Sequence, residues 1–347
     1  MKERDSRYEL LRIIATIAIT LNHVLCSKTA LTANWYVRQF FFLGGQFGVN
    51  LFVIIGAWFL CSSAFKSSRV LRMVAQMFFY TLSLDVLSWL LGTPVTVGGF
   101  LKSFSYWFCF GYAVMLMIAP FLQKIDKNAK SRVCIVGGGI ALGATVLGYM
   151  NPSLLIVRLS LKGLFIGPVW FSYVFILVSV IKENRERIRL SSKTWLLLFF
   201  ASYLMMYVIL IRAGKSFVRE VHSPLCFLSA FAMFGAVANT RTGYRRAVNW
   251  LAGYTFGAYL LQTHKLFHPY LWEGLFRFTS VSEKSPLYFM EGIAAVIVIF
   301  VFAASLEEIR KRVMTLKPVR NVMQTLSSYG DGMYGKMLLS GTDKGEK

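Results

Sequence analysis

An arginine and a histidine share one otherwise apolar segment near the start of the chain, RIIATIAITLNH, in which they are Arg12 and His23. Eleven residues correspond to about three turns of an α-helix, so both side chains would lie on one helix face, roughly 16 Å apart along its axis. A guanidinium suits phosphate binding, and an imidazole suits general-base catalysis at neutral pH. The spacing therefore indicates a phosphorylated substrate at one depth and proton transfer at another.

A purely structural interpretation of this pair stays open. Arg12 could extend its charge to the lipid headgroups, and His23 could simply pack against a neighbouring helix. The first explanation is sufficient for Arg12. The second explains His23 poorly, because this residue lies several positions inside the far end of its segment. We favour a functional role, since ionisable groups are costly in a membrane core.

The segments that must position these side chains are long and apolar. Of the 347 residues, 56% are hydrophobic and only 16% are charged, where a soluble domain would have nearer a quarter. Many apolar runs reach about 20 residues, enough to cross roughly 30 Å of hydrocarbon, and they do not alternate as barrel strands do. The sequence predicts an all-α, polytopic membrane bundle. About ten spans are expected, near 8–27, 39–62, 70–92, 104–122, 133–150, 164–181, 194–211, 222–239, 250–268 and 286–306.

The net charge of +22 is distributed in short basic clusters between these runs. Such clusters mark cytoplasmic loops, and Lys and Arg are more frequent in the loops that lie inside when both termini are cytoplasmic. This pattern favours a membrane protein over a nucleic-acid-binding one. The first apolar run follows basic residues, as in a signal peptide, but no small-residue cleavage site follows it. We expect it to be a retained helix.

The chain divides into an integral-membrane domain, 1–306, and a basic cytoplasmic tail, 307–347. In the tail, EEIRKRVMTLKPVRNVMQTL has apolar residues at helical spacing, interrupted by Pro318, and is expected to lie partly on the anionic inner leaflet. The final SGTDKGEK is expected to be disordered. The five cysteines show no metal-ligand spacing and read as buried apolar side chains, so no metal is expected.

Four further ionisable residues fall at two depths of the predicted bundle. Asp85 and His264 lie in the outer thirds of their spans, at the level of His23. Arg69 and Arg72 lie at the inner end of the third span, near the level of Arg12, although the positive-inside rule alone accounts for them. The arrangement indicates a phosphorylated donor that enters from the cytoplasm and chemistry deeper in the bundle.

Five segments, in order, resemble the acyltransferase 3 family of membrane-bound O-acyltransferases that modify bacterial glycans. They are YELLRIIATIAITLNH, FGVNLFVIIGAWFL, SSRVLRMVAQMFFY, YWFCFGYAVMLMIAPFLQ and YTFGAYLLQTH, and they extend the resemblance over residues 8 to about 306. Two positions depart from the family pattern. Ile55 replaces a serine before Gly56, and Asn50 replaces an aspartate of many members, so we assign no proton transfer to Asn50.

The resemblance implies an acyl-CoA donor, usually acetyl-CoA, and a hydroxyl acceptor on a cell-surface glycan or lipid-linked precursor, at a bacterial plasma membrane. It implies that His23 is catalytic, as a base or through an acyl-histidine, and that Arg12 orients the donor or the histidine. Arg69 and Arg72 become candidates for binding the CoA phosphates. Second-tier or substrate candidates are Asp85, His264, Trp107 and Asn50.

Two other classes of function are compatible with some of these features. About ten spans, glycines such as the GGG at 137–139 and buried polar residues also suit a transporter or flippase of glycan precursors. The sequence shows no convincing inverted repeat, which weighs against that class. A non-catalytic membrane scaffold would leave His23 and Asp85 without an explanation.

Overall fold

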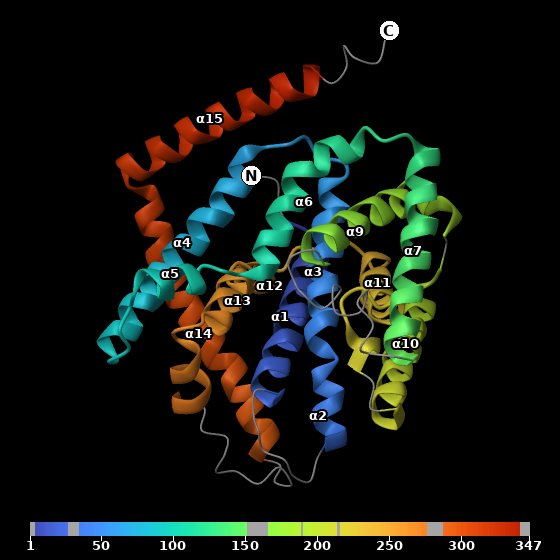
Figure 1. Ribbon diagram of the computed structural model, residues 1–347, viewed down its shortest axis with the longest axis horizontal. Helices are drawn as coiled ribbons and strands as arrows, with labels where there is room; N and C mark the ends of the chain where they lie inside the picture. Colours follow the sequence, from blue (N-terminus) through green and yellow to red (C-terminus); the bar gives the residue numbers. More distant parts are fainter. Residues whose placement is uncertain are drawn as a thin grey trace.

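The fold is helical throughout the part of the chain that the computed structural model describes, which is residues 4–26, 35–150, 166–188, 190–213, 216–275 and 287–340. The predicted all-α fold class is confirmed for these residues. In Figure 1 most of the long helices run side by side as a bundle, and α15 crosses one end of it above α4 and α6.

The first half of the chain forms α1 (Ser6–Cys26), α2 (Trp35–Phe42), α3 (Gly44–Leu60), α4 (Ser67–Leu90), α5 (Val97–Ser103), α6 (Trp107–Gln123) and α7 (Lys127–Met150). The second half forms α9 (Ile166–Glu183), α10 (Ser192–Ala213), α11 (Pro224–Ala238), α12 (Arg246–Ala252), α13 (Thr255–Thr263), α14 (Leu287–Thr315) and α15 (Lys317–Ser340). Short 3-10 turns occur at Arg185–Arg187 and Ser216–Arg219, and a π-helical turn occurs at Tyr270–Leu275.

Within the described ranges, six helical segments are long and apolar enough to cross a membrane. They are Arg38–Leu60, Ser67–Leu90, Lys127–Leu147, Ser192–Arg212, Phe217–Ala238 and Gly292–Thr315. The pair α5 and α6, bent by 63°, would add a seventh if it forms one span. This number is below the ten spans expected from the sequence. Helix α1 has the necessary length but carries Arg7, Glu9 and Arg12 in its first two turns.

The prediction of one continuous helix over 250–268 is wrong. Gly253 and Tyr254 separate α12 from α13, and α13 ends at Thr263, after which His264 has an extended backbone with φ −67° and ψ 121°. Glycine is a poor helix former, and the Thr255 hydroxyl donates to the Ala252 carbonyl at 2.9 Å at this break. The interruption places two short helices where the apolar run suggested one.

Helix α1 packs very closely against α3 at Gly48. A Cβ atom there would lie 2.7 Å from both the Ala15 carbonyl oxygen and the Ile19 Cγ1 atom, so only glycine permits this separation. Small residues commonly allow such close contact between membrane helices. Helix α1 also contacts α11, α12, α13 and α14. It therefore occupies the interior of the bundle, where Arg12 and His23 can meet other helices.

The tail continues the helical structure. Helix α14 extends through Thr315 without a break at 306–307, and α15 begins at Lys317 after a single intervening residue, Leu316. The change of direction therefore precedes Pro318, which lies in the first turn of α15, where proline is tolerated because the missing N–H has no helical acceptor. Residues 341–347, most of the segment expected to be disordered, lie outside the described residues.

Candidate functional site

A cavity of about 440 Å³ opens among the first turns of α1 and α4, the adjoining parts of α3 and α6, and the α12–α13 break. Four arginines line it, and we call it the arginine cavity: they are Arg4, Arg12, Arg69 and Arg72. None of its lining residues is acidic. This concentration of guanidinium groups makes the cavity suited to a polyanion such as a phosphorylated ligand.

The remaining wall of the arginine cavity is largely apolar and aromatic. It includes Phe52, Phe108, Tyr112, Leu116 and Phe256. Gly56 also lines it, and a Cβ atom at Gly56 would overlap the Tyr112 hydroxyl, so the absence of a side chain keeps this part of the wall open. A ligand with both phosphates and an apolar or aromatic part would match these surroundings.

Arg12 is held in the cavity wall by Glu9, one turn earlier on α1. The Arg12 Nη1 atom lies 2.7 Å from Glu9 Oε1, and the arginine side chain is 30% exposed whereas the glutamate side chain is 6% exposed. The pair orients the guanidinium while leaving part of it open to the cavity. Glu9 neutralises one of the four cations, so the cavity keeps a net positive charge.

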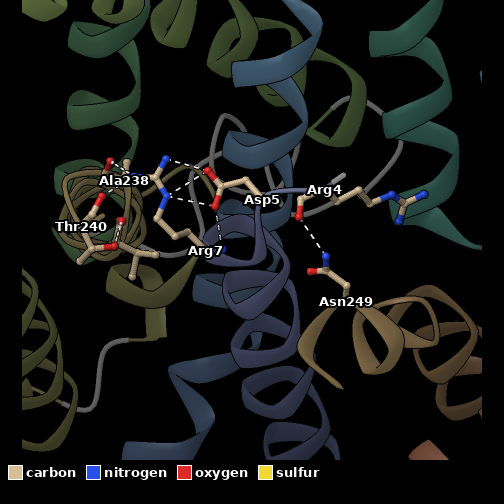
Figure 2. Close-up of polar contacts among 7 residues, drawn as sticks. Arg4, Asp5, Arg7, Ala238, Thr240 and Asn249 are labelled. Carbon is tan, nitrogen blue, oxygen red and sulfur yellow. Dashed lines mark hydrogen bonds and ion pairs between the residues drawn. The ribbon is translucent and has the colours of Figure 1, made fainter. Parts of the chain in front are cut away.

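The N-terminal segment is anchored by hydrogen bonds to the connection between α11 and α12. The Ser6 amide donates to the Gly243 carbonyl at 3.0 Å, and the Asn249 side-chain amide donates to the Arg4 carbonyl at 2.9 Å. Figure 2 shows that the Arg4 side chain points away from this network. The backbone is thus fixed on one side while the guanidinium is directed to the arginine cavity. Nothing in the spacing of the residues marks Arg4 as part of a site.

A second set of contacts in Figure 2 connects the same segment to the C-terminal end of α11. Arg7 pairs with Asp5 at 2.7 Å and donates to the carbonyls of Ala238 at 2.8 Å and Thr240 at 2.5 Å. Carbonyls at a helix C-terminus lack helical donors, and a cation there is favourable. The Arg7 guanidinium lowers the pKa of Asp5 below its ordinary value of 3.8, chiefly through their hydrogen bonds.

His23, farther along α1, faces α13. Its Nδ1 atom lies 3.1 Å from the Gln262 side-chain oxygen Oε1. Gln262 was not selected from the sequence, because a neutral amide in an apolar helix has no charge to mark it. It lies only two residues before His264, and each of the two faces a different helix. The partner of the candidate catalytic histidine is therefore an amide rather than a carboxylate.

His264 contacts Asp85 of α4. The His264 Nε2 atom lies 3.3 Å from Asp85 Oδ1, and both side chains are almost completely buried. The Phe267 amide donates to His264 Nδ1 at 3.2 Å, so the proton of the neutral ring lies on Nε2. Nε2 and Asp85 Oδ1 are close but do not have the geometry of a hydrogen bond. The two residues expected at one depth are thus in direct contact, at the point where α13 ends.

The structure does not bring every candidate to one place. Asn50 is fully buried away from the arginine cavity, where its amide donates to the Val221 carbonyl and its oxygen accepts from the Trp170 indole, both at 2.8 Å. Trp107 is 40% exposed and packs against Phe171. Both have a structural explanation that requires no substrate.

His23 is not among the residues that line the arginine cavity. Two helices connect the two places. Arg12 and His23 are both on α1, and on α13 Thr255 and Phe256 line the cavity whereas Gln262 contacts the histidine. No group of three or more potential metal ligands occurs among the described residues. The site therefore consists of the arginine cavity, which is suited to a polyanion, and of His23, which lies farther along α1.

Comparison with protein families gives a match over residues 5–307 to a family model described as an acyltransferase domain. The match includes the arginine cavity except for Arg4, together with His23 and its partner and the Asp85–His264 contact. Comparison with curated proteins and with solved structures gives no match.

Proposed function

Because this chain belongs to the acyltransferase 3 family, we propose that it transfers a small acyl group, most simply acetyl, from acyl-CoA to a hydroxyl of a cell-surface glycan or its lipid-linked precursor. The observation that carries this proposal is the arginine cavity, from which α1 and α13 lead to the His23–Gln262 pair. The charge pattern supports a cytoplasmic location for both termini and hence for the cavity.

The chemistry of coenzyme A matches the cavity in two respects. Its phosphates complement the guanidinium groups of Arg4, Arg69 and Arg72, which have no carboxylate partner among the described residues. Its adenine ring can stack on aromatic or guanidinium planes in the same wall. The long pantetheine arm can then extend along α1, over the roughly 16 Å between the levels of Arg12 and His23.

The contact with Gln262 determines which ring nitrogen of His23 carries the proton. With the amide oxygen accepting from Nδ1–H, the neutral ring has its lone pair on Nε2. Nε2 would remove the proton of the acceptor hydroxyl as its oxygen attacks the thioester carbonyl carbon. The carbon–sulfur bond then breaks, and the CoA thiolate recovers the proton from the imidazolium. In the alternative route, Nε2 itself attacks the thioester carbonyl carbon, and CoA leaves as the thiolate. The acceptor hydroxyl then attacks the acyl-imidazolium, its proton goes to the thiolate, and the neutral imidazole is restored.

The test uses membranes that contain the full chain, incubated with acetyl-CoA labelled in the acetyl group. We expect label in glycan for the wild type and none for His23→Ala, with His222→Ala as the control because His222 is a buried histidine outside this arrangement. Near-normal labelling by His23→Ala would overturn the assignment. Movement of glycan across the membrane without label would instead support the transporter class. Label trapped on the protein would identify the acyl-histidine route.

A further inference from the structure

A second basic cavity, of about 560 Å³, lies at the elbow where α14 meets α15 and where both helices approach the start of α4. We call it the elbow cavity. Four of its lining residues are cations, from all three helices: Arg72, Arg310, Lys311 and Arg320. No acidic residue is among those that line it. The elbow cavity shares only Arg72 with the arginine cavity and is therefore a separate place for a ligand.

Two of these cations already have a carboxylate partner. Arg310 pairs with Glu307 at 2.6 Å, and Lys311 pairs with Glu308 at 2.7 Å. Arg72 and Arg320 make no ion pair with any described residue. The elbow cavity therefore presents two uncompensated guanidinium groups, which is the chemistry that binds a phosphate.

The rest of the wall of the elbow cavity is partly apolar, unlike a binding site for a freely soluble ion. Ala75, Met314 and Met323 contribute apolar surface beside the cations. The cavity also lies at the end of Gly292–Thr315, a segment apolar enough to span a membrane. It is therefore placed at the level where a lipid headgroup meets its acyl chains.

Helix α15 supplies an independent observation. Its protein-facing side is fixed to the start of α4 and to the connection before it, since Asp331 accepts from the Ser67 amide at 2.7 Å, and Tyr334 stacks on Phe65 with ring centroids 3.9 Å apart. A separate stripe of exposed apolar residues follows helical spacing: Val322, Leu326, Tyr329, Met333 and Met337. The stripe lies roughly 110° around the helix from the face that packs on α4. Such a helix has the form of an interfacial helix that rests on a lipid surface.

From these observations we propose that the elbow cavity binds the phosphate headgroup of an anionic phospholipid, whose acyl chains continue along the apolar side of α14 and under α15. Figure 1 shows the geometry: α14 reaches the end of the bundle, and α15 leaves it at a steep angle across that end. Basic pockets between helices at the cytoplasmic face have the chemistry for such headgroups. This proposal does not depend on the acyltransferase activity.

The test measures lipid retention by native mass spectrometry of the full chain in detergent, with phosphatidylglycerol or phosphatidylcholine added. We expect one phosphatidylglycerol molecule to be retained tightly and phosphatidylcholine to be retained weakly. Arg320→Gln should weaken phosphatidylglycerol binding about tenfold, because it removes one charge-assisted hydrogen bond. Arg320→Lys, which keeps the charge, should preserve most of the binding.

Lys336→Gln is the matched control, since Lys336 is an exposed cation of the same helix outside the elbow cavity. Binding should be unchanged in this variant. Equal losses in Arg320→Gln and Lys336→Gln would show general attraction to a basic helix and would overturn the proposal. Equal retention of the two lipids would also overturn it. Displacement of the lipid by millimolar inorganic phosphate would assign the cavity to a soluble anion instead.

Discussion

His23 and Gln262 meet across the contact between α1 and α13, with the ring nitrogen Nδ1 3.1 Å from the amide oxygen. A carboxylate at this position would form an ion pair with a protonated ring, whereas an amide oxygen accepts a hydrogen bond from the neutral ring without adding charge to the membrane interior. The pair therefore favours a neutral imidazole whose second nitrogen is available to take a proton.

Changing either member of this pair should lower the rate of transfer without weakening the binding of the donor. We expect His23→Ala to lower the rate of transfer by about 10²–10⁴-fold, the usual contribution of a general base. Gln262→Leu keeps the size but removes the acceptor oxygen, so we expect a loss of about tenfold or more in kcat. Acetyl-CoA binding by the purified chain, measured by calorimetry, should stay within twofold of wild type in both variants. A large loss of donor binding in Gln262→Leu would refute this role.

Arg4 allows a test of the arginine cavity that does not alter the transmembrane helices. It is exposed apart from its place in the cavity wall, and its backbone is held independently of its side chain. We expect Arg4→Gln to raise the KM for acetyl-CoA about tenfold with little change in kcat, because a charge-assisted contact to phosphate is lost. The control is Lys193→Gln, on α10, away from the cavity. Equal KM values in the two variants would show that Arg4 does not contribute to donor binding.

Gly56 provides a steric test of the same cavity. A methyl group there would overlap the Tyr112 hydroxyl, so Gly56→Ala must displace the tyrosine into the cavity or shift α3. We expect the KM for acetyl-CoA to rise, and the double variant Gly56→Ala, Tyr112→Phe to recover part of the loss because it removes the overlapping hydroxyl. Wild-type kinetics in Gly56→Ala would show that this part of the wall does not touch the donor.

The Asp5–Arg7 contact should stabilise the N-terminal segment in a pH-dependent manner. Arg7 lowers the folded-state pKa of Asp5 below 3.8, so its contribution is fully present above the unfolded value and is lost as the pH falls through the lowered pKa. We expect Asp5→Asn to increase hydrogen exchange over residues 4–12 at pH 7. The effect should be small, about 1 kcal/mol or less, since the pair is partly exposed.

The difference between Asp5→Asn and the wild type should persist down to about pH 4 and close below it, as the wild-type carboxylate becomes protonated. Glu186→Gln, an exposed charge change elsewhere, is the control. The absence of any difference between Asp5→Asn and the wild type at pH 7 would mean that Arg7 acts through the carbonyls of Ala238 and Thr240 rather than through Asp5.

The sequence predicted the features that follow from one helix or from depth alone. Helical spacing placed Arg12 and His23 on one face, and the structure has Arg12 in the arginine cavity and His23 facing α13. Depth placed Asp85 and His264 at one level, and their side chains are 3.3 Å apart. The second agreement does not rest on the predicted span, because the helix expected over 250–268 is broken at Gly253 and ends before His264.

The remaining features depend on contacts between distant parts of the chain. Arg4 lines the cavity on a backbone that is held by Asn249, 245 positions later in the chain. Gln262 carries no charge that would mark it in an apolar helix. The break at Gly253 was obscured by the apolar residues on both sides of it, which read as one span. A single sequence records none of these, because each is decided by which helices become neighbours.

Arg72 belongs to the walls of both cavities, and one guanidinium cannot give its full set of hydrogen bonds to two phosphates at once. If both sites are occupied as proposed, lipid and donor are thermodynamically linked through this side chain, and the penalty that each imposes on the other must be equal. The apparent affinity for acyl-CoA would then fall as the anionic lipid content of the surrounding bilayer rises, so that membrane composition would regulate the supply of acyl groups.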